Sequence, residues 1–119
     1  MGGMSTSSEP AADPGAADPA ASSRAIDDLL GTLDGGDTTG WTGSVHLHCT
    51  DVAGEWLVVH EPGGVVTVTR EHAKGGCALR GPAGNLLEVL WRRAGLDQVD
   101  VVGDADLAAR FVAATELPA

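Results

Sequence analysis

The sequence predicts an α+β fold in which a mostly antiparallel, five-stranded sheet carries helices on one face. Two observations lead to this class. Between residues 44 and 80, short segments that alternate or are rich in β-branched residues are separated by turn signals, as in an antiparallel meander. Apolar residues at helical spacing occur before and after these segments, with one more short strand between the last two helices. Helices set apart from consecutive strands pack most naturally on one sheet face.

Length and composition indicate a single domain behind a tail. The chain of 119 residues suffices for one domain, which we expect over residues 24–119. Residues 1–23 consist almost entirely of Ala, Pro, Ser, Gly and Asp, with no aromatic or β-branched aliphatic side chain. Such a segment cannot bury enough apolar surface to offset the entropy of ordering, so we expect it to be a disordered tail.

The first helix is predicted to begin at Arg24. Ser22 or Ser23 can cap its start, and Gly35-Gly36 ends it. Its apolar residues recur at helical spacing: Ile26, Leu29, Leu30 and Leu33.

Three strands are predicted next, over residues 44–50, 55–60 and 65–70. In the first, Val45, Leu47 and Cys49 alternate with His46, His48 and Thr50, which is the period of a half-buried strand. Residues 51–54 and 62–64 supply the turns between them. The apolar set of the first strand is expected to face the helices.

The remaining elements are a short strand over 77–80, a helix that starts with Pro82 and ends at Gly95, a strand over 99–102 and a helix capped by Asp104. The apolar faces of the two helices are Leu86, Leu87, Leu90 and Ala94, and Leu107, Phe111 and Ala114.

The charge balance excludes some partners. Seven Lys and Arg stand against seventeen Asp and Glu, a formal net charge of −10. Nucleic acids and anionic membranes are therefore not expected, because binding to phosphates relies on basic side chains. Residues 1–23 contain no Lys or Arg, so they lack the basic start of a signal peptide, and no apolar run approaches the roughly 18 residues of a membrane span. We expect a cytoplasmic protein, and the sequence leaves its oligomeric state open.

Two histidines share one side of the first predicted strand. His46 and His48 lie roughly 6 to 7 Å apart along it, which suits chelation if a third ligand comes from elsewhere. His60 and His72 are the candidates, but their register is not fixed by the sequence. Two well-spaced ligands fall short of the three or four that Zn²⁺ requires. The sequence alone therefore predicts neither a metal nor a cofactor. It predicts that both histidines lie on a polar or interface-facing surface of the sheet.

No catalytic residue is expected. Cys49 and His48 are neighbours on a strand and point apart, so they do not form a nucleophile–base pair. Cys49 and Cys77 are interpreted as small core residues. The sequence contains no phosphate-binding loop, dinucleotide fingerprint or serine-hydrolase elbow.

The candidate binding surface is the sheet face that carries the two histidines, with Trp56 nearby. Trp56 and Trp91 are interpreted first as core or rim residues, and lining a pocket or docking face is the alternative. Arg92 and Arg93 suit a helix C-terminus. The full set of candidate surface residues is His46, His48, Asp51, Trp56, Arg80, Trp91, Arg92 and Arg93.

Three stretches, HLHCTDVAGEWLV, VTVTREHAKGGCALRGPAGNLLEVLWRR and VVGDADLAARF, carry a family resemblance. Over about residues 24–117 the chain resembles the C-terminal domain of mycothiol-dependent maleylpyruvate isomerases. The positions that match are His46, His48, Thr50, Asp51, Glu55, Trp56, Arg80, Gly81, Pro82, Leu90, Trp91, Arg92, Arg93, Gly103 and Asp104.

The resemblance implies a sterol-carrier-like fold in an actinobacterial, cytoplasmic setting. The family's full-length enzymes add an N-terminal DinB-like domain whose histidines and glutamate bind the catalytic metal. The 119 residues do not include such a domain, so catalysis is not carried over. The family's C-terminal domain supplies an arginine that assists catalysis, and Arg80, Arg92 and Arg93 are all candidates for it here.

Three functions remain open from the sequence. The chain is expected to be a non-catalytic accessory module that partners a DinB-like metal-binding protein. Alternatively, it is a small carrier that binds an apolar ligand in a sterol-carrier-like cavity. The third possibility is one component of a thiol-dependent isomerase.

Overall fold

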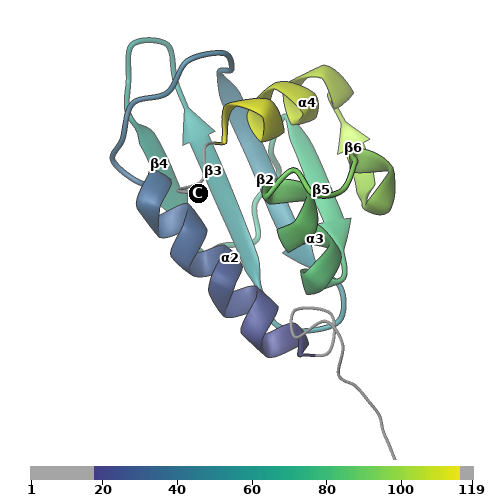
Figure 1. Cartoon of the computed structure of the whole chain (residues 1–119). Helices are drawn as coiled ribbons and strands as arrows, with labels where there is room; N and C mark the ends of the chain where they lie inside the picture. Colours follow the sequence, from purple (N-terminus) through teal and green to yellow (C-terminus); the bar gives the residue numbers. More distant parts are fainter. Residues whose placement is uncertain (1–17, 116–119) are drawn as a thin grey trace, which may run out of the picture.

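The computed structural model describes residues 18–115 and confirms the α+β class (Figure 1). Along the chain its elements are α2 (Pro19–Leu33), β2 (Gly43–Cys49), β3 (Glu55–His60), β4 (Val66–Thr69), β5 (Cys77–Gly81), α3 (Ala83–Leu90), the 3₁₀ turn η1 (Leu96–Gln98), β6 (Asp100–Gly103) and α4 (Ala105–Ala114). The α-helices within this range lie on one side of the sheet. None of them is long and apolar enough to cross a membrane.

The five strands form one sheet in the order β4-β3-β2-β5-β6. All neighbouring pairs are antiparallel except β2 and β5, which run parallel. The mostly antiparallel sheet was predicted, but the parallel pair was not. Because β5 runs parallel to β2, residues 70–76 must cross β3 and β2 on their way from the end of β4 to the start of β5. We call residues 70–76 the crossing segment.

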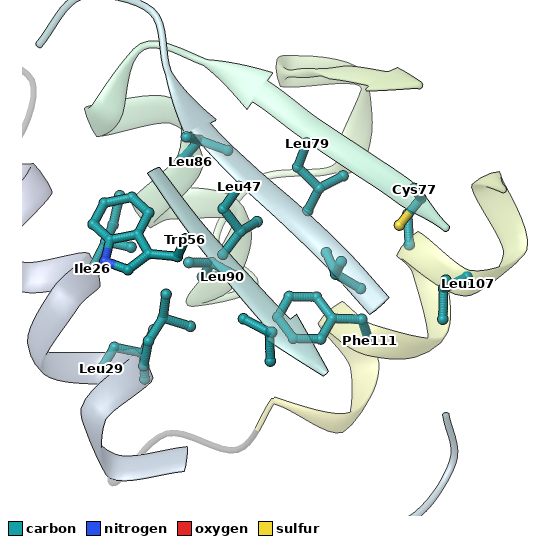
Figure 2. Close-up of a cluster of buried hydrophobic side chains, with 14 of the residues drawn as sticks. Ile26, Leu29, Leu47, Trp56, Cys77, Leu79, Leu86, Leu90, Leu107 and Phe111 are labelled. Carbon is teal, nitrogen blue, oxygen red and sulfur yellow. The ribbon is translucent and has the colours of Figure 1, made fainter. Parts of the chain in front are cut away.

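The core lies between the sheet and the helices (Figure 2). Val45, Leu47 and Cys49 are buried on this side, as their alternation predicted. They meet side chains from the three α-helices. The fully buried contributors from these helices include Ile26, Leu30, Leu86, Leu90 and Phe111.

Helix α2 begins five residues before the predicted start at Arg24. Its N-cap is Asp18, whose carboxylate accepts a hydrogen bond from the backbone N–H of Ala21 at 3.2 Å, and Pro19 occupies the first turn. An Asp-Pro pair supplies both the cap and a residue preset for the first turn, so the cap predicted at Ser22 or Ser23 is wrong. Residues 1–17, and with them most of the predicted tail, lie outside the described residues.

Helix α3 is shorter than predicted. It ends at Leu90 instead of continuing to Gly95, because Arg92 adopts a left-handed backbone conformation with φ 57°. The Arg92 guanidinium donates hydrogen bonds to the carbonyl oxygens of Ala113, at 3.2 Å, and Thr115. These are carbonyls at the end of α4, where a cation also complements the helix dipole. At the other end of α4, Asp104 caps the helix as predicted.

Candidate functional site

Three histidines and one glutamate converge on the sheet face opposite the helices. His48 lies directly across from Glu55 in the β2–β3 register, His46 is two residues along β2, and His72 comes from the crossing segment. Glu55 Oε2 lies 3.0 Å from His46 Nε2, 2.9 Å from His48 Nδ1 and 2.5 Å from His72 Nδ1. We call these four residues the histidine cluster.

The electrostatics of the cluster centre on the carboxylate. Contacts with His72 first, then with His48 and His46, lower the pKa of Glu55 to about 2, so the group is ionised at neutral pH. His46 is buried, His48 half-buried and His72 exposed, so the cluster extends from the sheet to solvent. Imidazole nitrogens and a carboxylate oxygen are donor atoms that a transition-metal ion accepts.

Only one of the two candidate third histidines joins the cluster. His60 is buried elsewhere, with Nδ1 2.7 Å from the carbonyl oxygen of Trp41 and Nε2 3.1 Å from that of Gly64. It therefore anchors two loops, and His72 is the residue brought to His46 and His48. The sequence prediction did not include Glu55 as a ligand.

Trp56 is buried on the helix side of the sheet, so its predicted place on the sheet face that carries the histidines is wrong. In the β2–β3 register it faces Leu47 on the helix side of the sheet, and it is 2% exposed. Its indole Nε1 donates a hydrogen bond to Asp27 of α2 at 2.9 Å. Strand alternation sends Glu55 to one face and Trp56 to the other.

The other predicted surface residues are divided between the two sides of the sheet. Arg80 is exposed and lies opposite His48 in the β2–β5 register, so it shares the histidine face. Asp51 accepts a hydrogen bond from the backbone N–H of Ala83 at 2.9 Å and so serves the first turn of α3. Trp91, which is 39% exposed, has the Arg93 guanidinium over its ring at 4.3 Å.

Trp91, Arg92 and Arg93 follow helix α3 on the helix side of the sheet and are not part of the histidine cluster. Arg92 is engaged with the end of α4, and Arg93 forms an ion pair with Glu88 at 3.4 Å.

Both cysteines are buried core residues, as predicted. Burial raises the pKa of each thiol to about 11, with a smaller contribution from Asp51 for Cys49 and from Asp104 for Cys77. The thiols stay protonated at neutral pH and are poor nucleophiles.

A second candidate site is a cleft between the end of α2, the loop before β2 and the end of α4. Its volume is about 740 Å³. At its base, the rings of Trp41 and Phe111 meet edge to face with their centroids 5.2 Å apart. The lining residues are Leu33, Asp37, Thr38, Thr39, Gly40, Trp41, Val66, Arg110, Phe111, Ala113, Ala114 and Thr115. We call this the Trp41 cleft; the sequence prediction did not include Trp41.

No protein-family model matches the chain, and no curated protein matches it, so membership of the maleylpyruvate isomerase family stays a prediction. The solved structures that are similar to it include the following two. One is described as a UbiJ-SCP2 ubiquinone synthesis protein, with a TM-score of 0.48 and 17% identity over 76% of this chain and 74% of that one. The other is Sterol Carrier Protein 2 Like 2 from Aedes aegypti, with a TM-score of 0.49 and 16% identity over 79% of this chain and 93% of that one. Both names contain the sterol carrier protein 2 term, and the sterol-carrier-like fold that the family resemblance implies stays a prediction.

Proposed function

We propose that this chain is a carrier that binds a small amphipathic molecule, with the apolar body of that molecule in the Trp41 cleft. The observation that carries the proposal is the cleft itself, whose volume of about 740 Å³ lies within the range of about 300–1,000 Å³ usual for ligand pockets.

The chemistry of the lining suits a ligand with two unlike ends. Leu33, Val66 and Ala114 join the two aromatic rings on the apolar side. Thr38, Thr39, Asp37 and Arg110 add polar and charged residues to the lining. Among the described residues that line the cleft there is no cysteine or histidine, so the cleft has neither a thiol nor an imidazole base.

Filling the cleft is expected to weaken binding of an apolar probe. Ala114 lines the cleft from the last turn of α4, and Ala114→Phe places a ring in it. Titration of a fluorescent nitrobenzoxadiazole-labelled stearate into the wild-type chain should saturate, and the dissociation constant should rise at least about tenfold in Ala114→Phe, equivalent to about 1.4 kcal/mol.

The matched control is Ala109→Phe, at an exposed position of the same helix outside the cleft, which should bind the probe like the wild type. Failure of the wild type to saturate, or equal loss in the two variants, would contradict the carrier function.

A second candidate is the accessory role that the family resemblance implies, with a DinB-like metal-binding protein as partner. The observation in its favour is the sheet face opposite the helices, which within the described residues is crossed only by residues 70–76. Arg80 and Val102 are exposed there, and Val102 is 53% exposed. A half-open antiparallel face with mixed polar and apolar groups suits a reversible interface.

This candidate is tested by mixing the chain with the DinB-like domain of a maleylpyruvate isomerase. Comigration on a sizing column that is lost in Arg80→Glu, and kept in Arg110→Glu on the far side, would support it. Isomerisation of maleylpyruvate by the mixture in the presence of mycothiol would support the reading of the chain as an isomerase component. Separate elution of the two proteins would argue against both.

A further inference from the structure

We infer that His46, His48, His72 and Glu55 form a binding site for Zn²⁺ or a similar divalent transition-metal ion. One ligand atom from each side chain lies within 4.8 Å of those from the other three. The four residues come from two adjacent strands and the crossing segment, so the fold itself gathers them. The site is separate from the Trp41 cleft and does not depend on the proposed carrier function.

The donor set selects the class of ion. Three imidazole nitrogens and one carboxylate oxygen match the ligands and the number of ligands that Zn²⁺ takes in proteins. Mg²⁺ and Ca²⁺ prefer oxygen ligands throughout, so they are disfavoured here. Co²⁺ and Ni²⁺ accept the same nitrogen-rich set and can serve as substitutes for Zn²⁺.

The distances are close to those of a loaded site. In a tetrahedron with bonds of about 2.0–2.1 Å, neighbouring ligand atoms lie about 3.3 Å apart. Glu55 Oε2 is already 3.0, 2.9 and 2.5 Å from the nitrogens of His46, His48 and His72. The nitrogens, within 4.8 Å of one another, need to approach by at most about 1.5 Å, which side-chain rotations can supply.

The crossing segment is tied down on both sides of His72. Before it, the Arg70 guanidinium pairs with Asp27 of α2 through both carboxylate oxygens, with Nε 2.7 Å from Oδ1. After it, the backbone N–H of Gly76 donates to the carbonyl oxygen of Ser44 at 2.8 Å. At Gly75 a Cβ atom would lie 2.9 Å from the carbonyl oxygen of Ser44, so only glycine allows this close approach. The third imidazole is therefore held near the other two before any ion arrives.

An ion can reach the site from solvent. His72 is exposed, and a cleft of about 470 Å³ lined by Glu55, Trp56 and His72 opens beside the cluster towards α2. His46 forms the buried end of the site at 7% exposure. The alternative without a metal is a polar cluster in which the imidazoles only hydrogen-bond to the carboxylate. The two alternatives differ in whether the cluster takes up an ion in a saturable way.

The test uses the full chain without an affinity tag, stripped of metal with a chelator and titrated with ZnCl₂ by calorimetry. We expect one equivalent to bind with a dissociation constant of about 10 μM or below. Co²⁺ should give the intense visible absorption of a four-coordinate ion with nitrogen ligands. His72→Ala should weaken zinc binding at least about tenfold, and because His72 is exposed the variant should keep the wild-type circular dichroism spectrum.

Glu71→Gln is the matched control, because Glu71 is the exposed neighbour of His72 in the same segment. It should bind zinc like the wild type. The site is refuted by the absence of saturable binding in the wild type, or by binding that persists unchanged in both His72→Ala and His46→Ala/His48→Ala. The second result would place the ion elsewhere.

Discussion

Replacing Trp56 with alanine is expected to lower the free energy of unfolding by about 3–5 kcal/mol. The indole is 2% exposed and packs between β3 and α2, where it donates a hydrogen bond to Asp27 (Figure 2). The substitution removes a large buried ring and leaves a cavity. It also takes away one of the two partners of Asp27, the other being Arg70. Urea unfolding followed by circular dichroism measures the loss.

Trp91→Ala provides the comparison for that measurement. Trp91 is 39% exposed and has one described ring partner, Arg93, at 4.3 Å. Its loss should cost about 1 kcal/mol or less, because most of the ring contacts solvent. Equal and small effects at the two tryptophans would mean that Trp56 belongs to a surface and not to the core.

Phe111→Ala is expected to cost a similar amount, about 3–5 kcal/mol. Phe111 is fully buried, and its edge-to-face contact with Trp41 joins α4 to the loop before β2. The same substitution removes the base of the Trp41 cleft, so binding of the labelled stearate should weaken as well. Both effects are measured on one preparation, by urea unfolding and by fluorescence titration.

Val112→Ala is the control for Phe111→Ala, because Val112 is half-buried in the same helix and does not line the cleft. It should cost about 1 kcal/mol and leave probe binding unchanged. Wild-type stability in Phe111→Ala would show that α4 does not pack on the Trp41 ring.

The elements that depend on local patterns could be predicted from the sequence. The alternation of Val45, Leu47 and Cys49 placed that side of β2 against the helices, and Asp104 marked the start of α4. Each of these two patterns involves residues close together in the sequence. Strand alternation and N-cap geometry then fix the directions of their side chains. Helix α3 shows the limit of such patterns, because its end depends on Arg92 and its contacts with α4, about twenty residues away.

The histidine cluster required information that a local pattern does not contain. The pairing of His48 with Glu55 depends on the β2–β3 register, and a slip of one residue would move Glu55 to the other face. His72 arrives because β5 pairs with β2 in parallel, which sends residues 70–76 across the sheet. A hairpin register counted back from the turn at residues 51–54 could have suggested Glu55. Nothing in the sequence fixes the parallel pair.

The two proposed sites lie in separate parts of one small domain. The Trp41 cleft lies among α2, α4 and the loop before β2, whereas the histidine cluster lies on the sheet face opposite the helices. The lining of the cleft includes aromatic rings and threonines, whereas the cluster consists of three imidazoles around one carboxylate.

The most direct test of this two-site arrangement is one set of backbone amide NMR spectra, recorded with Zn²⁺ and, separately, with the labelled stearate. Zinc should shift the resonances of residues 46–48, 55 and 70–76, and leave those of residues 37–41 and 110–115 in place. The stearate should produce the reverse pattern. Shifts from both ligands in the same residues, or no residue-specific shift from either, would contradict the assignment of two sites.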